Sequence, residues 1–246
     1  MAPRFFVDLP LEAGATPMLP AGAARHVQVL RLQPGAAVTL FNGAGGEWAA
    51  EVLRIGRSEV QVRLGAHDPV ERELPLAVTL ALGMPANERM DTLVEKATEL
   101  GVAAIEPLVC ERSVLRLAGE RAERKRAHWQ GVAVAAAEQC GRTRLPRIGT
   151  IRSFAEMLDD ALGACARPSA RFVLSLRPDA PPWSHCLAAV SFESLRFISG
   201  PEGGLSPLEE QRAIEAGALP VSLGRRTLRA DTAPLAALAA LALRFG

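Results

Sequence analysis

The stretch that decides the fold is FISGPEGGLSPLE, residues 197–209, in which an apolar run leads into a glycine-rich loop and then into a helix start. Ser206, Pro207 and Glu209 occupy the N-cap, first and third positions of a capping box, a pattern typical of helix N-termini. A loop with little side-chain bulk between a buried strand and a helix suits close approach to a small ligand. A second glycine turn follows at residues 223–224, so we expect the ligand chemistry near the C-terminus.

The loop sequence GPEGGL excludes two common phosphate-binding motifs. It does not match the GxGxxG fingerprint of dinucleotide-binding folds, and it lacks the Lys-Ser/Thr pair of a P-loop. Taken alone, the loop is also compatible with a purely structural turn between a strand and a helix. The second glycine turn, which follows the next apolar run, favours a ligand site.

Composition and charge indicate a globular protein with one locally basic segment. The chain has 246 residues, of which 49% are hydrophobic, and this is enough for a sizeable core in one or two domains. A net charge of +1 excludes a surface that binds polyanions over its whole area. Between residues 112 and 147, however, nine Arg or Lys stand against three Glu. We expect this segment to meet phosphate groups.

The spacing of the cysteines and the length of the apolar runs predict whether the protein binds metal, contacts a membrane or leaves the cytoplasm. The four cysteines lie far apart, without a CxxC pair or a Cys/His cluster, which predicts neither a zinc site nor a disulfide framework. The chain begins without a signal-peptide pattern, and its longest apolar run, residues 233–243, is shorter than the roughly 20 residues that span a membrane. We therefore expect a cytoplasmic protein with no bound metal and no membrane contact.

The periodicity of apolar residues divides the chain into two domains. Residues 1–70 contain short alternating runs, as in a small β-barrel, and a charged, proline-bounded linker follows at 67–75. In residues 71–246, apolar runs alternate with helical patterns, which predicts an α/β domain with a mainly parallel sheet. Strands are expected at 38–41, 47–55, 59–64, 76–83, 103–109, 171–176, 195–199 and 219–223. Helices are expected at 23–32, 87–100, 119–139, 207–216 and 232–245.

Seven short motifs follow one another along nearly the whole chain. They are HVQVLRL at 26–32, FNG at 41–43, EKATELGV at 95–102, ERS at 111–113, AAEQCGRTRLP at 136–146, GPEGGLSPLE at 200–209 and LGRRTLRADTA at 223–233. In this order they resemble the ribosomal RNA small subunit methyltransferase E family of the SPOUT superfamily. The resemblance implies a small PUA-like β-barrel that binds RNA, residues 1–70, and an α/β SPOUT domain with a C-terminal trefoil knot and a mainly parallel sheet, residues 71–246.

The resemblance also implies an activity, a cofactor and partners. Members of the family methylate N3 of a uridine in 16S ribosomal RNA, use S-adenosylmethionine as methyl donor without a metal, and form homodimers. The assembled 30S subunit is the expected substrate. Three knot loops would hold the cofactor, largely through backbone groups. The cofactor-binding residues so implied are Leu174, Ser175, Leu176, Gly200, Glu202, Leu223, Gly224 and Leu228.

Charged residues near these motifs are the candidates for catalysis and RNA binding. We expect Arg229 to stabilise the developing uracil anion, and Glu202 or Glu138 to accept the proton or to orient groups. Glu138 belongs to the run EQCGRTR at 138–144, which is alternatively a polar helix end with Gly141 as its C-cap. The RNA-binding candidates are Arg4, Arg25, His26, Arg31, Arg112, Arg142 and Arg144.

At three positions the chain departs from the family pattern. Ala230 and Asp231 stand where the family more often has Thr-Glu, and Arg177 stands where some relatives have a histidine that is able to act as a base. Asp231 or Thr232 also suits a helix N-cap. Two other functions stay open: a non-catalytic RNA-binding factor in ribosome assembly, and a SPOUT enzyme that methylates another RNA base.

Overall fold

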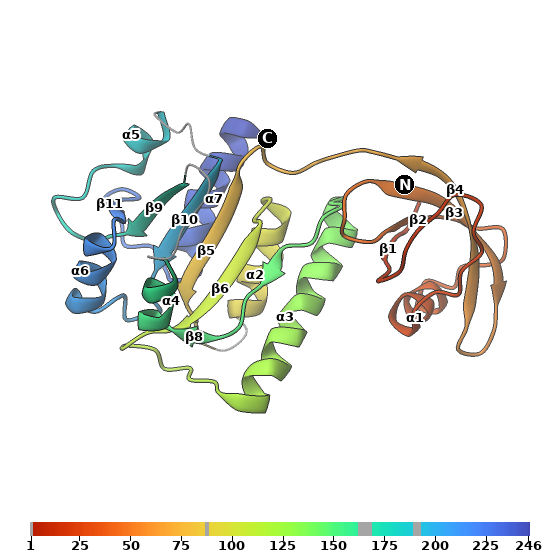
Figure 1. Ribbon diagram of the computed structural model, residues 1–246, viewed down its shortest axis with the longest axis horizontal. Helices are drawn as coiled ribbons and strands as arrows, with labels where there is room; N and C mark the ends of the chain where they lie inside the picture. The colour runs from red at the N-terminus through yellow and green to blue at the C-terminus, as the bar shows by residue number, and fades with distance from the viewer. Residues whose placement is uncertain (1, 87–88, 162–168, 189–192) are drawn as a thin grey trace. The chain divides into compact units, whose positions relative to one another are not determined.

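The computed structural model describes residues 2–86, 89–161, 169–188 and 193–246 (Figure 1). The chain forms two compact units. The first consists of Met1–Glu73 with Val134–Leu145, and the second of Leu74–Ala133 with Pro146–Gly246. The first break lies close to the predicted boundary after residue 70. The assignment of residues 134–145 to the first unit is a feature that the sequence prediction does not contain.

The first unit contains β1 (Arg4–Phe6), α1 (Ala21–Val29), β2 (Ala37–Phe41), β3 (Glu47–Ile55) and β4 (Val60–Asp68). Its strands form one sheet in the order β1-β2-β3-β4, in which β1 and β2 are parallel and the other pairs antiparallel. On β4, Val60, Val62 and Leu64 are buried while Arg63 is exposed, which is the period of two expected for a strand with one buried face. The predicted β-rich N-terminal domain is therefore confirmed.

The segment after residue 133 enters the first unit as the end of α3 (Gly119–Cys140). Gly141 follows the helix with φ of +88°, the left-handed conformation that ends many helices, so its predicted C-cap role is confirmed. Beyond it, the carbonyl of Thr143 accepts a hydrogen bond from Gly45 in the turn between β2 and β3, at 3.3 Å. Backbone contacts thus join this segment to the sheet.

The second unit contains β5 (Ala77–Gly83), β6 (Ala104–Val109), β7 (Arg147–Ile148), β8 (Arg152–Ser153), β9 (Ser169–Leu174), β10 (Ser194–Ser199) and β11 (Leu219–Val221). The strand order is β11-β9-β10-β5-β6-β7, and β8 also pairs with β6. In the described part of the chain, all of these ladders are parallel. This confirms the predicted α/β domain with a mainly parallel sheet.

Helices cover both faces of this second sheet (Figure 1). Besides α3 they are α2 (Arg89–Glu99), α4 (Phe154–Ala161), α5 (Trp183–Ala188), α6 (Pro207–Glu215) and α7 (Thr232–Phe245). On one face, Leu93 of α2, Trp129 of α3 and Leu238 of α7 share a core with strand residues. On the other face, Met157 of α4 and Ala213 of α6 form a separate core. Burial on both faces explains why β5 is a nearly continuous apolar run.

Five short elements were not predicted, namely β1, β7, β8, α4 and α5. They have two to eight residues, which is too short for a helical or alternating period to show clearly. The predicted start of a helix at Asn87 lies outside the described residues. The trefoil knot stays a prediction, because strand order and pairing alone do not test it.

Candidate functional site

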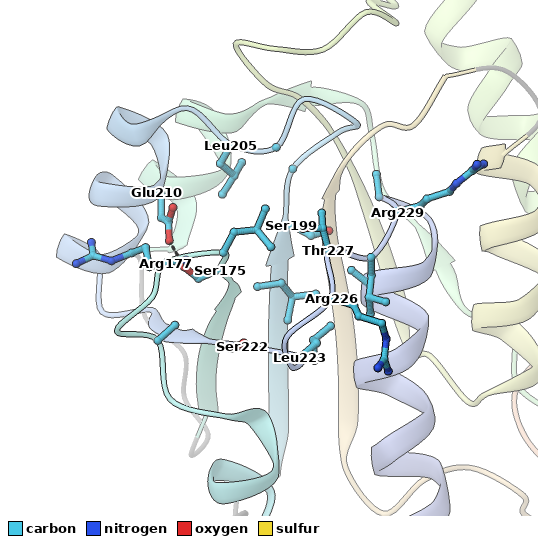
Figure 2. A pocket seen from close by; sticks show the side chains of 18 of the residues that line it. Ser175, Arg177, Ser199, Leu205, Glu210, Ser222, Leu223, Arg226, Thr227 and Arg229 are labelled. Carbon is cyan, nitrogen blue, oxygen red and sulfur yellow. Dashed lines mark hydrogen bonds between the residues drawn. The ribbon is translucent and has the colours of Figure 1, made fainter.

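Three loops at the carboxyl ends of parallel strands surround a cavity of about 900 Å³ (Figure 2). The loops follow β9, β10 and β11, which are neighbours in the sheet. Ligands of open parallel sheets bind at this edge, and the volume suits a ligand of nucleoside size. The cavity is lined by all eight residues predicted to bind the cofactor: Leu174, Ser175, Leu176, Gly200, Glu202, Leu223, Gly224 and Leu228.

The loop after β10 presents bare backbone to the cavity. A Cβ on Gly200 would lie 2.3 Å from the carbonyl carbon of Gly204 and 2.3 Å from the nitrogen of Leu205, which is closer than real Cβ atoms approach. Gly204 has φ of +70°, and its N–H donates to the carbonyl of Pro201 at 2.8 Å. The loop is therefore a tight turn that closes only with glycine at position 200.

The capping box at the start of α6 is confirmed. The N–H of Glu209 donates to Ser206 Oγ at 3.2 Å, and the N–H of Ser206 donates to Glu209 Oε2 at 2.9 Å. The second carboxylate oxygen, Glu209 Oε1, accepts a hydrogen bond from the N–H of Glu111 at 2.8 Å. This buried carboxylate therefore holds the helix start and the loop after β6 together.

Two charged side chains brace the glycine loop. Glu202 Oε1 accepts a hydrogen bond from the N–H of Ala86 at 2.9 Å and lies 3.5 Å from Arg89 Nη1. Arg112 Nη1 donates to two carbonyls of the loop, at 2.9 and 3.3 Å. The predicted catalytic Glu202 and the predicted RNA-binding Arg112 both line the cavity. The hydrogen bonds of these two side chains, and the ion pair of Glu202 with Arg89, hold the loop in place.

The few polar side chains inside the cavity converge from separate elements. Ser199, at the end of β10, is 5% exposed, and its Oγ is buried without a hydrogen-bond partner in the described structure. Ser175 Oγ donates to the carboxylate of Glu210 and accepts from the N–H of Arg177 at 3.1 Å. Apolar side chains such as Leu205 complete the wall (Figure 2). A buried hydroxyl without an internal partner is an available contact for a ligand.

The loop after β11 adds three exposed arginines to the cavity rim. No hydrogen bond or ion pair of the guanidiniums of Arg225, Arg226 or Arg229 occurs among the residues that the structure describes. Figure 2 shows the side chains of Arg226 and Arg229 pointing away from Ser199. Arg225 and Arg226 are absent from the predicted site residues. Their signal in the sequence was a pair of arginines directly after Gly224.

The positions that depart from the family pattern lie close to this rim. The carbonyl of Arg229 accepts hydrogen bonds from the first residues of α7, including Thr232, at 2.9 Å. Asp231 occupies the N-cap position of α7, as the sequence suggested, but its side chain makes no capping bond. Arg177 lines the cavity and forms an ion pair with Asp179 at 2.9 Å.

Glu138, the third predicted catalytic residue, belongs to the first unit and is not among the described residues that line the cavity. Its Oε1 accepts a hydrogen bond from the N–H of Phe6 at 2.9 Å, and its Oε2 lies 3.4 Å from His26 Nδ1. Burial raises the pKa of Glu138 above its ordinary value, although the Phe6 N–H and His26 act in the opposite direction. Its catalytic role stays a prediction, and its observed contacts join α3 to β1 and α1.

Two predicted RNA contacts need correction. The side chain of Arg4 is 7% exposed, forms an ion pair with Glu47, and donates to the carbonyls of Gly141 and Arg142 at 3.2 and 3.1 Å. The side chain of Arg142 is 5% exposed, and its Nε donates to Glu73 Oε1 at 2.9 Å. Guanidiniums buried against carboxylates inside the first unit do not reach RNA.

The other predicted RNA contacts of the first unit stay predictions. Arg25 and His26 are exposed on α1, and Arg31 is exposed just beyond this helix. Arg144 is half exposed and donates to Glu71 Oε2 at 2.7 Å, a surface ion pair that a phosphate group is able to replace.

Three further observations concern the Cys110 thiol, groups of metal ligands and membrane-spanning helices. Burial raises the pKa of the Cys110 thiol to about 12, so this cysteine is not a thiolate nucleophile at neutral pH. Within the described ranges, no group of three or more His, Cys, Asp or Glu side chains is arranged to hold a metal ion. A search of the same residues finds no helix with the length and apolar character needed to cross a bilayer.

Comparisons with known proteins cover both units. The family described as RNA methyltransferase domain matches residues 72–242, and the family described as RNA methyltransferase PUA domain matches residues 19–65. Ribosomal RNA small subunit methyltransferase E of Bacillus subtilis is 30% identical over 97% of this chain and 95% of its own length. The protein of the same name from Synechocystis is 34% identical over 97% of this chain and 77% of its own length.

Two solved structures are similar over almost the full length. A putative methyltransferase from Legionella pneumophila in complex with the cofactor SAM has a TM-score of 0.91 and 31% identity, covering 99% of this chain and 98% of that one. A ribosomal RNA small subunit methyltransferase E from Neisseria gonorrhoeae bound to S-adenosyl methionine has a TM-score of 0.89 and 34% identity, covering 100% and 99%. Together with the three-loop cavity, these similarities establish that the chain belongs to the ribosomal RNA small subunit methyltransferase E family.

Proposed function

We propose that this chain binds S-adenosylmethionine in the three-loop cavity and transfers its methyl group to ribosomal RNA. Membership of the family supports this function, as do the two similar structures that hold the same cofactor. The observation that carries the proposal is the three-loop cavity, which Ser199 helps to line; the buried hydroxyl of Ser199 has no hydrogen-bond partner among the described residues. A polar atom of a bound ligand would satisfy it.

The residues of the cavity fit the chemistry of this cofactor. A purine needs apolar walls and hydrogen bonds along its edge, and leucine side chains beside bare backbone provide both. Leu174, Leu205 and Leu223 supply the walls, and Gly200 and Gly224 let the backbone come close. The bound cofactor would supply a methyl group that is already activated by a positively charged sulfur. The task of the protein is then to bind, to orient and to exclude water.

The finer proposal is that the acceptor is N3 of a uridine in 16S ribosomal RNA. Loss of the N3 proton places negative charge on the ring, and a guanidinium near a ring carbonyl stabilises that charge. Arg229 at the rim is suited to this role, while Arg225 and Arg226 are suited to neighbouring phosphates. Such contacts hold the acceptor nitrogen in line with the methyl group. The entropy of orientation is then lost when the substrate binds, which lowers the activation barrier of the transfer step.

The decisive experiment for this function is methyl transfer with a defined product. The purified chain is incubated with S-adenosylmethionine and with 30S subunits, 50S subunits or naked 16S RNA, and the modified nucleoside is identified by mass spectrometry. We expect N3-methyluridine in the RNA of 30S subunits. Methylation of another base would overturn the finer proposal alone. Failure to bind the cofactor at millimolar concentration would leave a non-catalytic assembly factor as the function.

The family resemblance also leads us to propose that the chain acts as a homodimer in the cytoplasm, where ribosomal subunits are assembled. Sedimentation of the purified chain tests the oligomeric state. A monomer at micromolar concentration, with or without S-adenosylmethionine, would contradict this part of the proposal.

Replacing Ser199 with alanine separates ligand binding from stability. Because the hydroxyl has no hydrogen-bond partner in the part of the chain that the structure describes, the free energy of unfolding should stay unchanged or rise. Cofactor binding should weaken by about 1 kcal/mol, or roughly fivefold, through the loss of one hydrogen bond. Denaturant unfolding and calorimetry with S-adenosylmethionine measure the two effects.

Ser153→Ala is the matched control for this experiment. The Oγ of Ser153 accepts a hydrogen bond from the N–H of Glu156 at the start of α4, at 3.2 Å. This variant should therefore lose stability and keep its cofactor affinity, the reverse of the Ser199 variant. Cofactor affinity equal to that of the wild type in Ser199→Ala would mean that no ligand atom satisfies the hydroxyl.

Two variants of Glu202 distinguish a structural role, in which the side chain braces the loop, from a role in proton transfer. Glu202→Gln keeps an oxygen that accepts from the N–H of Ala86, whereas Glu202→Ala removes it. If the side chain only braces the loop, cofactor affinity should fall roughly tenfold in the alanine variant and change by less than about twofold in the glutamine variant. Calorimetry and single-turnover methylation measure both. A glutamine variant that binds the cofactor normally but does not methylate would assign proton transfer to this carboxylate.

A further inference from the structure

Glu210, in the first turn of α6, is absent from the predicted site residues, yet it lines the cofactor cavity and is partly buried (Figure 2). Its Oε1 accepts a hydrogen bond from Ser175 Oγ. Within the described ranges of the chain, its Oε2 takes part in no hydrogen bond or ion pair. One oxygen of this carboxylate is therefore fixed by the protein, while the other is available to a ligand.

The capping box at the start of α6 fixes where this carboxylate lies. Because Ser206 and Glu209 form the box, the helix begins at Pro207, and Glu210 falls in its first turn. The N–H of Glu210 donates to the carbonyl of Ser206 at 3.0 Å. Glu209 faces the loop after β6, whereas Glu210 faces the loop after β9. Two neighbouring carboxylates thus have different surroundings, and only the second of them lines the cavity.

Ser175 holds the Glu210 carboxylate from the loop after β9. Ser175 is buried, and its N–H donates to the carbonyl of Val221 on β11 at 2.9 Å. Its hydroxyl accepts a hydrogen bond from the N–H of Arg177 at 3.1 Å and donates its single proton to Glu210. A hydroxyl is neutral, so this hydrogen bond orients the carboxylate and leaves its negative charge in place.

The guanidinium of Arg177, on the same loop, is paired with another carboxylate. Its Nε donates to Asp179 Oδ1 at 3.0 Å, and its Nη2 donates to Asp179 Oδ2 at 2.9 Å. The pKa of Arg177 is raised mainly by Asp179, with a smaller contribution from Glu210. Figure 2 shows the Arg177 side chain pointing away from Ser199. Arg177 therefore leaves the inner side of the Glu210 carboxylate without a bound cation.

Most of the charged side chains around the cavity are positive. Those that the structure describes in its lining are Arg89, Arg112, Arg177, Arg225, Arg226, Arg229, Glu202 and Glu210. A cation that enters this cavity is repelled by the arginines and attracted by the two carboxylates. Glu202 already accepts from the N–H of Ala86 and lies 3.5 Å from Arg89. Glu210 is thus the described lining carboxylate that is open to a cationic ligand.

S-adenosylmethionine carries two positive groups, and they differ in hydrogen bonding. Its sulfonium has no N–H or O–H, so it cannot donate a hydrogen bond. Its α-ammonium group has three N–H donors, as the ammonium of lysine has. Adenine and ribose are neutral, and the leucine walls and bare backbone of the cavity suit them. A carboxylate with an open oxygen is matched best by the ammonium group.

We propose that Glu210 binds the α-ammonium group of S-adenosylmethionine, an inference that rests on the cofactor proposed above. Oε2 accepts the charge-assisted hydrogen bond, while Ser175 holds Oε1 and acts as a positioning residue. The negative charge of Glu210 also offsets the repulsion between the arginines and the cofactor. Glu210 thereby favours ligands that carry an amino acid group over nucleosides that lack one.

Calorimetry of the full-length protein with three ligands tests this assignment. S-adenosylmethionine has both the ammonium and the sulfonium, S-adenosylhomocysteine keeps the ammonium and lacks the sulfonium, and methylthioadenosine lacks both. Glu210→Gln should weaken binding of the first two about tenfold, through loss of a charge-assisted bond, and change the affinity for methylthioadenosine less than about twofold. Removing a negative charge does not weaken contact with the carboxylate of the cofactor, so such a loss reports on a positive group.

Glu215→Gln is the matched control. It removes the same charge from the last residue of the same helix, where the exposed carboxylate accepts a hydrogen bond from Gln211 at 3.0 Å. Glu215 is not among the described residues that line the cavity, so all three affinities should stay unchanged. Both variants should remain folded in thermal unfolding, because Glu210 is only partly buried and glutamine keeps an oxygen that accepts from Ser175.

Three results in Glu210→Gln would overturn the assignment. An equal loss for all three ligands would mean that Glu210 only holds the loop of Ser175 in place. A loss for S-adenosylmethionine alone would identify the sulfonium as the group that is attracted. Unchanged affinities would mean that the carboxylate contacts no charged group of the ligand. In each case a wild type that binds S-adenosylmethionine leaves the proposed function standing, whereas a wild type that does not bind it would overturn both proposals.

Discussion

Gly200→Ala is expected to abolish cofactor binding while most of the fold survives. The added Cβ would lie 2.3 Å from the backbone of Gly204 and Leu205, and backbone atoms cannot rotate out of the way as a side chain does. The turn must therefore open. Overpacking of this kind costs about 1–3 kcal/mol, and the displaced loop would no longer line the cavity. Calorimetry should show a fall in S-adenosylmethionine affinity of about 100-fold or more.

Replacements of two other glycines distinguish the steric clash expected at residue 200 from the general effects of replacing a glycine with alanine. Gly204→Ala meets no atom within 4 Å, but φ of +70° should strain the alanine by roughly 1–2 kcal/mol. Gly131→Ala, inside α3, also has open space, and it should stabilise the protein by up to about 1 kcal/mol without affecting the cofactor. Cofactor affinity in Gly200→Ala no lower than in Gly204→Ala would show that the close backbone approach at residue 200 is unimportant for the site.

Arg229→Ala is expected to lower the single-turnover rate of methyl transfer by about 100-fold, a loss typical for one donor to a developing anion. Its guanidinium has no described partner inside the protein, and the carbonyl that begins α7 is part of the backbone and is kept. Cofactor affinity and the free energy of unfolding should therefore stay near those of the wild type. The single-turnover rate of the variant should rise more steeply with pH, because the uracil anion must then form without stabilisation by the Arg229 guanidinium.

Arg226→Ala is the matched comparison for this variant. The two arginines lie on the same loop, and both are exposed at the cavity rim. We assign Arg226 to RNA phosphate, so its removal should weaken RNA binding and leave the rate at saturating RNA nearly unchanged. A full single-turnover rate in Arg229→Ala, at saturating RNA and cofactor, would contradict the role proposed for Arg229.

Two of the three loops around the cofactor cavity were predictable because each is a local pattern, whereas the loop at Leu174–Leu176 followed only from the family resemblance. The turn at Gly200, the capping box at Ser206 and the turn at Gly224 can each be recognised within about ten residues, since turn and cap preferences depend on neighbouring backbone. Parallel strands then place the three loops at the same edge of the sheet. The cavity-lining residues therefore follow from the sequence pattern together with the family resemblance.

The roles of charged side chains were much less predictable. Arg4 and Arg142 were predicted to contact RNA, but their carboxylate partners are Glu47 and Glu73, 43 and 69 positions away. Glu202 is a similar case, because the N–H that it binds belongs to a residue 116 positions away. A charged residue in a motif has the same appearance whether it faces solvent or a partner brought close by folding.

By itself, the sequence determined the two-domain organisation, the parallel sheet, and the glycine turns that line the cofactor cavity, because periodicity, capping and turn chemistry act over short distances. The tertiary structure alone decided which arginines are buried in ion pairs and which remain open at the rim. It also placed the Glu210 carboxylate of α6 beside the Ser175 hydroxyl, which belongs to the loop after β9. Electrostatic pairing depends on distance in space, and that distance is set only when the strands pair.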